Sequence, residues 1–389
     1  MRRSTILSLL PALLTLSHAQ ATESLVVTAA QIAQSIKSSL PNPSLVLVPQ
    51  PYYWWQSGIV NNALFTYGFV TGDKQFEDLA KNTLYNQATA ANDFMMPDAT
   101  GNDDQAWWAL SALTAAENNV AVPAGSPTFL SMAQNVFNEQ KGRWDESSCS
   151  GGMRFKINAG DVGYEYKSSI ANGLFFQLAA RLAKLTGDAD AKAWAEKSYD
   201  WIASTGLIDT DFNVYDGTDA ASGCVDLNHN QWSYNAGVFL YGAAVMASQT
   251  GDAKWADRTN GLLAAAQRNF VRDSALYEPI CEDQGTCNND QVSFKGILAR
   301  WLGATAVERP DLKGPIAVTL GGVSAQVQKS WAPSLGSMQQ FVALESVDAA
   351  IRASGGMAAA YGMISPRSSE DAAGRSMRRS VAGRIVWDA

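Results

Sequence analysis

The sequence predicts an all-α fold, an (α/α)6 barrel of six helical hairpins. Three segments repeat an Ala-rich helix, a Thr-Gly-Asp turn and a second helix, with turn glycines at Gly72, Gly187 and Gly251. Glycine favours the end of a helix and aspartate favours the N-cap of the next one, so each triplet predicts a joint between two helices. A fourth joint at Gly125 gives successive spacings of 53, 62 and 64 residues. Such a period is typical of a repeated supersecondary unit.

The helices are expected in six pairs along the chain. In order they are 63–84, 104–118 with 128–140, 174–202, 236–263, 293–306 with 315–331, and 337–354 with an earlier or terminal partner.

The first helix of each pair is apolar nearly all round, as in 107–110 and 173–180, whereas the second carries charge, as at Lys192 and Glu196. This alternation predicts an inner ring of buried helices wrapped by an outer ring. An open solenoid would alternate in the same way but would need polar caps, and six pairs favour closure. We therefore expect one barrel domain over 20–362 and a mobile tail over 363–389.

The composition excludes several classes of protein. Of 389 residues, 47% are hydrophobic and 17% charged, so the chain is globular rather than disordered. Lys and Arg number 29 against 37 Asp and Glu, giving a net charge of −8. An acidic chain without clustered cations is a poor partner for nucleic acid.

Residues 1–19 resemble a secretory signal peptide. Two arginines precede an apolar run, and Ser17-His18-Ala19 provides a small-x-small cleavage site. Cleavage there leaves His229 as the single histidine, which excludes a zinc site with several histidine ligands. No later apolar stretch approaches the roughly 20 residues that span a bilayer. We expect a secreted, soluble monomer.

Four cysteines entering an oxidising compartment predict two disulfides. Cys281 and Cys287 bracket five residues, and so short a loop closes at little entropic cost. This favours Cys281–Cys287 and, by elimination, Cys149–Cys224.

The sharpest candidate for chemistry is a pair of adjacent aspartates, Asp103 and Asp104, at the expected start of a buried helix. Capping of the helix alone would explain them. Retaining glycosidases, however, need two carboxyls about 5–5.5 Å apart, one ionised and one protonated. The ionised member of a close pair raises the proton affinity of the other, so adjacent aspartates at a rim suit this chemistry.

Aromatic residues accompany the acidic pair. Trp54 and Trp55 follow two tyrosines on a Pro-led loop, and their faces suit stacking on pyranose rings. Most of the 12 tryptophans are explained by core packing. For Trp54 and Trp55 the sugar-binding and core interpretations have equal weight.

Seven blocks of the sequence together resemble glycoside hydrolase family 76, the endo-α-1,6-mannosidases, and within it the fungal cell-wall branch. The blocks are Pro51–Gly58, Gly101–Gln105, Arg143–Glu146, Tyr166–Gly173, Val214–Gly217, Gln231–Gly237 and Asn288–Gly296.

The resemblance implies an (α/α)6 barrel and retaining chemistry on α-1,6-linked mannose, with Asp103 as nucleophile and Asp104 as general acid/base. It also implies mannan or a mannose-containing glycan as substrate and wall glucan as an acceptor in transglycosylation. Residues of the matched blocks are expected to line the same cleft as the acidic pair. These substrate-binding candidates are Trp54, Trp55, Asn102, Asn172, Asp216, Gln231, Trp232, Asn235 and Asp290.

Two questions stay open at the level of sequence. Hydrolysis and transglycosylation share their first step and differ only in the acceptor. The alternative function from another class is a mannan-binding wall protein without activity, although a lectin has no need of two abutting carboxyls.

Fungal members of the family usually end in an apolar tail for a lipid anchor, whereas 381–389 are short and polar, which disfavours such an anchor.

The remaining motifs are weak. Asp209-Thr-Asp-Phe-Asn imitates the start of a calcium loop, but Val214 and Ala220 occupy the positions of its glycine and glutamate. For His229 a structural hydrogen bond is favoured over catalysis. No nucleotide, phosphate-loop, zinc-protease or serine-hydrolase motif is present, so no cofactor or metal is expected.

Overall fold

The structure, a computed structural model, describes the backbone of residues 9–355 and the side chains of 20–355. The predicted tail, 363–389, lies outside the described residues. Within the described part there are twelve α-helices. They are α1 (Leu9–Ser39), α2 (Trp54–Thr71), α3 (Glu77–Gln87), α4 (Asn102–Glu117), α5 (Phe129–Gly142), α6 (Ser169–Thr186), α7 (Ala189–Ser204), α8 (Ser233–Thr250), α9 (Ala253–Phe270), α10 (Gln291–Glu308), α11 (Lys313–Ser330) and α12 (Ser337–Ser354).

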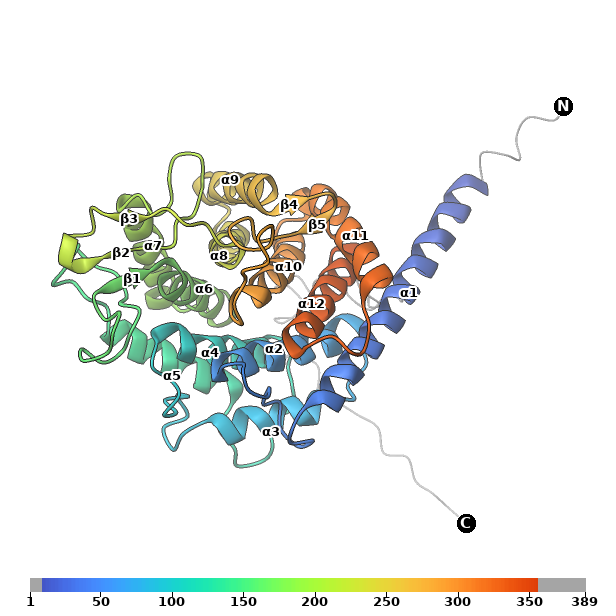
Figure 1. Cartoon of the computed structure of the whole chain (residues 1–389), viewed down its shortest axis with the longest axis horizontal. Helices are drawn as coiled ribbons and strands as arrows, with labels where there is room; N and C mark the ends of the chain where they lie inside the picture. The colour runs from blue at the N-terminus through green and yellow to red at the C-terminus, as the bar shows by residue number, and fades with distance from the viewer. Residues whose placement is uncertain (1–8, 356–389) are drawn as a thin grey trace, which may run out of the picture.

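The even-numbered helices form the inner ring of an (α/α)6 barrel (Figure 1). Each contacts the next, and α12 contacts α2, which closes the ring. These helices are buried on nearly every side because they pack against two ring neighbours and an outer helix. In α6, for example, every residue from Ser169 to Ala183 is buried. The predicted inner ring is confirmed.

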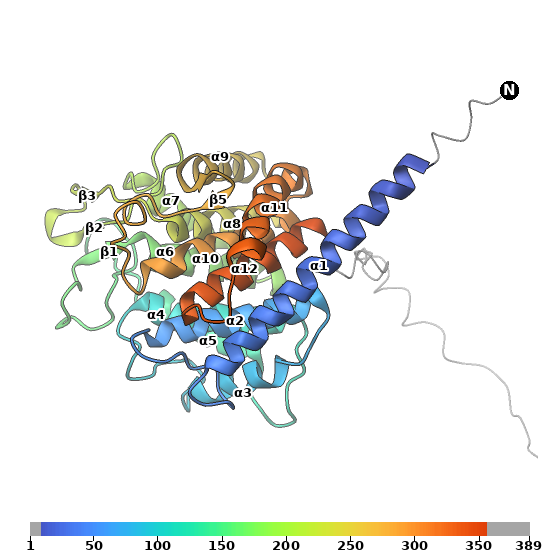
Figure 2. The same cartoon turned by 45° about the vertical axis from the view of Figure 1, so that its right-hand side comes forward.

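The odd-numbered helices cover the ring from outside. α7 and α9 each pack on the inner helix that precedes them, and α1 packs on α12. Figure 2 shows α1 beside α12. The sixth pair, whose partner the sequence left open, is thus formed by the first and last described helices, so both ends of the domain hold the barrel closed.

Two Thr-Gly-Asp joints have the predicted geometry. Gly187 and Gly251 adopt left-handed backbone conformations (φ 76° and 67°) at the ends of α6 and α8. Asp188 and Asp252 then accept backbone N–H groups as N-caps of the outer helices.

The first joint differs, and the prediction that Asp73 caps its outer helix is wrong. Gly72 is left-handed as expected (φ 77°), but α3 begins only at Glu77. The carboxyl of Asp73 instead accepts hydrogen bonds from the Tyr67 hydroxyl at 2.5 Å and from the Gln75 backbone N–H at 3.0 Å. A tertiary contact to the preceding helix therefore replaces the cap.

Five short strands occupy loops where no strand was expected. β1 (Tyr166–Ser168), β2 (Gly217–Asp219) and β3 (Leu227–Asn228) form one antiparallel sheet, and β4 (Val271–Arg272) and β5 (Ala275–Leu276) form a hairpin. Strands of two or three residues are too short to show the alternation by which sequence reveals strands. β1 runs directly into α6, so the first sheet anchors loops at the end where inner helices begin.

Both predicted disulfides are confirmed, with Cα–Cα distances of 5.7 Å for Cys149–Cys224 and 4.8 Å for Cys281–Cys287. Among the described helices, none combines the length and apolar character required to cross a membrane.

Candidate active site

A cavity of about 440 Å³ opens where the inner helices begin. Its walls come from the first residues of α2, α4, α8 and α10 and from the loop before β1. The lining residues are Tyr53, Trp54, Trp55, Pro97, Asp98, Thr100, Asp103, Asp104, Trp107, Phe155, Lys156, Tyr234, Asp290 and Phe294.

Asp104 lies in the first turn of α4 and is held by hydrogen bonds. One of its oxygens, Oδ2, accepts the backbone N–H of Gly101 at 2.7 Å and that of Thr100 at 3.1 Å, as well as the Thr100 hydroxyl at 3.3 Å. Burial raises the pKa of Asp104, while these bonds oppose the rise by favouring the ionised form.

Asp103 is the less solvated member of the pair. Its Oδ1 is buried and has no hydrogen-bond partner among the described residues. Burial raises the pKa of Asp103 well above the usual range for aspartate, and the neighbouring Asp104 raises it further. Both carboxyls have raised pKa values, but Asp104 accepts three hydrogen bonds on Oδ2 whereas Asp103 Oδ1 has no partner among the described residues, so the pair can divide into an ionised and a protonated member.

Gly101 is the N-cap of α4 and leaves room for both carboxyls. A Cβ at this position would lie 2.3 Å from Asp103 Oδ1 and 3.2 Å from Asp104 Oδ2. Its φ of −108° is open to any residue, so the requirement for glycine here is one of space.

Asn102 ties the start of α4 to the loop beside it. Its backbone N–H donates to the carbonyl of Phe155 at 2.9 Å, and its side-chain amide donates to that of Arg154 at 2.8 Å. Asn102 therefore lies behind the cavity lining, and its bonds bring Phe155 and Lys156 to the cavity wall.

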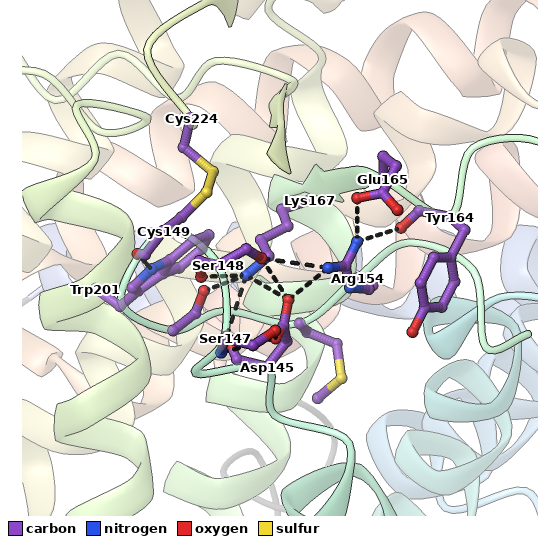
Figure 3. A network of polar contacts seen from close by, with 12 residues as sticks. Asp145, Ser147, Ser148, Cys149, Arg154, Tyr164, Glu165, Lys167, Trp201 and Cys224 are labelled. Carbon is purple, nitrogen blue, oxygen red and sulfur yellow. Dashed lines mark hydrogen bonds and ion pairs between the residues drawn. A yellow bond between two sulfur atoms is a disulfide. The ribbon is translucent and has the colours of Figure 1, made fainter. Parts of the chain in front are cut away.

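An ionic network around the buried Lys167 holds this loop (Figure 3). Lys167, fully buried, pairs with Asp145 at 3.1 Å and donates to the carbonyls of Ser148 and Gly151. Arg154 pairs with Asp145 at 2.9 Å and with Glu165 at 2.6 Å. The pKa of Asp145 lies far below its ordinary value: hydrogen bonds from Ser147, Ser148 and Lys167 outweigh the effect of burial.

Trp54 and Trp55, for which the sequence favoured neither a sugar-binding nor a core role over the other, line the cavity and also pack against the core. Trp54 stacks on Trp108 at 5.2 Å and Trp55 on Trp107 at 5.4 Å, measured between ring centroids. The indole N–H of Trp55 donates to Asp290 Oδ1 at 3.2 Å. That bond joins α2 to the N-cap of α10 across the ring.

The opposite wall contains aromatic residues that sequence reasoning missed. Tyr234 stacks face to face on Phe294, with ring centroids 3.8 Å apart. Both belong to matched blocks at helix starts, which was the available signal. Phe155 and Lys156 lie in an irregular loop and had no such signal.

Asp216 lies outside the cavity lining in a polar cluster of its own. It accepts hydrogen bonds from the Tyr166 hydroxyl at 2.6 Å, from Asn228 at 3.2 Å and from Asn235 at 3.5 Å. Burial raises its pKa. Asn235 Oδ1 is buried without a partner in the described part of the chain.

Three other candidates also lie outside the lining. Asn172 is buried and bonds only to the backbone of Met153 and Ser168. Gln231 accepts a hydrogen bond from Asn269 at 2.9 Å, and Trp232 packs edge-on against Phe294, which does line the cavity.

The weak motifs have structural partners. Asp209 accepts the backbone N–H groups of Asp211 and Asn213 and the hydroxyl of Tyr215, so its carboxyl closes its own loop. His229 packs edge-on against Tyr215 at 4.3 Å. Over residues 20–355, no three His, Cys, Asp or Glu side chains are grouped as a metal site requires.

A family model described as Glycosyl hydrolase family 76 matches residues 22–346. The chain belongs to glycosyl hydrolase family 76. Mannan endo-1,6-alpha-mannosidase DCW1 of Saccharomyces cerevisiae is 38% identical over 286 residues, which cover 72% of this chain and 64% of that protein. This family 76 chain thus spans less than two thirds of the DCW1 length.

Solved structures share the fold. Dfg5 from Chaetomium thermophilum, in complex with glucosamine, superposes with a TM-score of 0.80 at 31% identity, covering 86% of this chain and 90% of that one. An inactive variant of the α-1,6-mannanase GH76A of Salegentibacter, in complex with α-1,6-mannotriose, gives a TM-score of 0.70 at 17% identity, covering 84% and 99%. The (α/α)6 barrel of this family 76 chain is therefore shared with both.

Proposed function

We propose that this chain is a retaining endo-α-1,6-mannosidase that acts on fungal cell-wall mannan or on the mannose core of glycolipid anchors. The observation that carries the proposal is the pair of adjacent carboxyls, Asp103 and Asp104, in a cavity with aromatic walls. The name of the yeast relative and the mannotriose bound by the bacterial mannanase support the same substrate class.

In the proposed reaction Asp103 attacks the anomeric carbon while Asp104 protonates the departing glycosidic oxygen. The bond between sugar and leaving group breaks as the bond to Asp103 forms, giving a glycosyl-enzyme. Asp104 then takes a proton from water or from a sugar hydroxyl, which attacks the same carbon and restores both carboxyls. Water gives hydrolysis, and a sugar hydroxyl gives transglycosylation.

These roles require a proton transfer within the pair. In the free protein, hydrogen bonds to Asp104 favour its ionised form, and burial beside Asp104 favours the protonated form of Asp103. The nucleophile must be ionised when substrate is present. We propose that the glycosidic oxygen, as an acceptor beside Asp104, draws the proton to Asp104 and leaves Asp103 charged.

The aromatic residues would bind the sugar rings. Trp54, Trp55 and the stacked pair of Tyr234 and Phe294 line the cavity, and Asp290, which also lines it, would accept hydrogen bonds from sugar hydroxyls. Asn172, Gln231 and Asn235 would instead brace the surrounding loops, because their hydrogen bonds connect protein segments.

The proposed site of action is outside the cell or in the wall. The signal-like segment 1–19 and two disulfides support maturation in an oxidising compartment.

The test combines binding and turnover of α-1,6-mannotriose by the wild type and by Asp103→Asn. An enzyme is expected to turn over the trisaccharide, and the variant to bind it without turnover. Binding by the wild type without turnover of any α-1,6-mannoside would instead indicate a lectin. Adding a glucan oligosaccharide and identifying the products distinguishes transfer from hydrolysis.

A further inference from the structure

A second cavity lies at the other end of the barrel, lined by middle and later turns of the inner helices. Its volume is about 340 Å³, within the range of small-molecule sites. We call it the basal cavity. All six inner helices contribute to it, in chain order through Asn62, Glu117, Arg181, Tyr241, Arg300 and Arg352.

Stacked indoles separate the basal cavity from the catalytic cleft. Trp107 lines the cleft and Trp301 lines the basal cavity. Their rings stack with centroids 5.8 Å apart and planes 13° apart. The two cavities are therefore distinct sites.

Two of the cations in the basal cavity are neutralised by acids that also line it. Arg181 donates to both carboxylate oxygens of Glu117, at 2.9 and 2.7 Å. Lys184 pairs with Glu308. These two pairs leave no net charge for a ligand.

Arg300 is neutralised by an acid that does not line the basal cavity. It pairs with the fully buried Glu345 at 2.5 Å and donates to the carbonyl of Ile59. The next acid along, Asp348, is buried without a hydrogen bond in the described part of the chain. Burial and the neighbouring Glu345 raise the pKa of Asp348 well above its usual range, which favours its neutral form.

Arg352 is the cation left over. It makes no ion pair and no side-chain hydrogen bond within residues 20–355, and its Nε is buried without a partner. Its guanidinium lies 5.8 Å from the ring centroid of Phe69, another lining residue. Arg352 is therefore the cation lining the basal cavity that has no ion-pair partner within the described residues, whereas Arg181, Lys184 and Arg300 are each paired.

Asn62 is a second unsatisfied group in this cavity. Its side chain is 3% exposed, and neither end of its amide is hydrogen-bonded within the described residues. Leaving the buried Oδ1 of Asn62 unpaired costs free energy, so a ligand that donates a hydrogen bond to this oxygen is favoured.

We infer that the basal cavity binds a small oxyanion bearing a hydroxyl group, such as hydrogen phosphate or a sugar phosphate. Arg352 supplies the charge, the amide N–H of Asn62 donates to an anionic oxygen, and the amide oxygen of Asn62 accepts from the hydroxyl. This site is independent of the proposed mannosidase activity, because none of these residues lines the catalytic cleft.

The inference is tested by titrating the full chain calorimetrically with inorganic phosphate, glucose 6-phosphate and glucose. Glucose derivatives are used because a mannose phosphate could also enter the cleft. We expect saturable binding of at least one of the two phosphates and none of glucose. Tighter binding of glucose 6-phosphate would identify a sugar phosphate, and equal binding would identify the free oxyanion.

Variants locate the binding. Arg352→Gln and Asn62→Leu should each weaken phosphate binding by about tenfold or more, because each removes a charge-assisted bond. Arg352→Lys retains the charge and should keep measurable phosphate binding. This conservative variant remains informative if Arg352→Gln or Asn62→Leu fails to fold. The control Arg272→Gln removes an equal charge from an exposed ion pair with Asp283 and should bind as the wild type does. Absence of binding to both phosphates, or equal affinity in Arg352→Gln, would overturn the inference.

Discussion

Replacement of Gly101 by alanine offers a sharp test of the catalytic assignment, because the nearest atoms to the added methyl group belong to the acidic pair and one neighbouring carbonyl. The new Cβ would lie 2.3 Å from Asp103 Oδ1, 3.2 Å from Asp104 Oδ2 and 3.4 Å from the Phe155 carbonyl oxygen. Alanine tolerates the backbone angles at this position, with φ at −108°. The contact with Asp103 must therefore be relieved by movement of its carboxyl.

The required movement sets the expected loss of activity. To regain an ordinary van der Waals contact, the Asp103 carboxyl must move by roughly 1 Å, and a displacement of this size can cost about 100-fold in rate. That loss corresponds to about 2.7 kcal/mol in activation free energy. We expect kcat/KM on α-1,6-mannotriose to fall by about this factor while the thermal unfolding temperature changes little.

The matched control is Gly314→Ala in α11, where a Cβ would meet no atom within 4 Å. This variant should retain wild-type turnover. If Gly101→Ala remained within threefold of the wild type on the same substrate, the position of the Asp103 carboxyl would not matter to the reaction, and its role as nucleophile would be refuted.

Three further predictions concern the acidic pair, a buried glutamate and the disulfides. Asp104→Ala should still form the glycosyl-enzyme from a substrate with an activated leaving group, and azide should rescue its turnover with retained configuration. Azide rescue of Asp103→Ala should give the inverted product, because azide then replaces the nucleophile; retention from Asp103→Ala and inversion from Asp104→Ala would exchange the two roles. Burial raises the pKa of Glu278 to about 8, so the folded protein binds a proton at Glu278 more tightly than the unfolded chain does. The free energy of unfolding therefore has its full value below the ordinary glutamate pKa and falls as the pH rises through about 8. Urea unfolding at pH 5 and pH 9 should show a loss in the wild type larger by a few kcal/mol than in Glu278→Gln, and equal losses would contradict this account. The Cys149–Cys224 disulfide closes a sequence separation of 75 and Cys281–Cys287 one of 6, so the longer loop should contribute more to stability through chain entropy. Denaturant unfolding should show that removing Cys149–Cys224 costs about 2 kcal/mol more than removing Cys281–Cys287. A reversed order would show that native-state contacts dominate.

Local patterns in the sequence were enough to predict the architecture. The inner helices are apolar on nearly every face because the ring buries them. Glycines in the left-handed conformation, such as Gly187, end these helices. The pair Cys281–Cys287 and the placement of Asp103 and Asp104 at the start of a helix are likewise decided by residues close together along the chain. Each of these features depends on short-range geometry, which sequence displays directly.

Tertiary structure decided what depends on partners distant in the chain. It paired α1 with α12, moved Asp73 from its expected cap to the hydroxyl of Tyr67, and brought Phe155 and Lys156 to the catalytic cavity through the bonds of Asn102. It also distinguished Asp290, which lines that cavity, from Asn172, whose polar atoms are bonded to backbone. Matched blocks indicate which residues gather at one rim, but the direction of each side chain is set by hydrogen bonds and packing across the ring, which form only when the barrel closes.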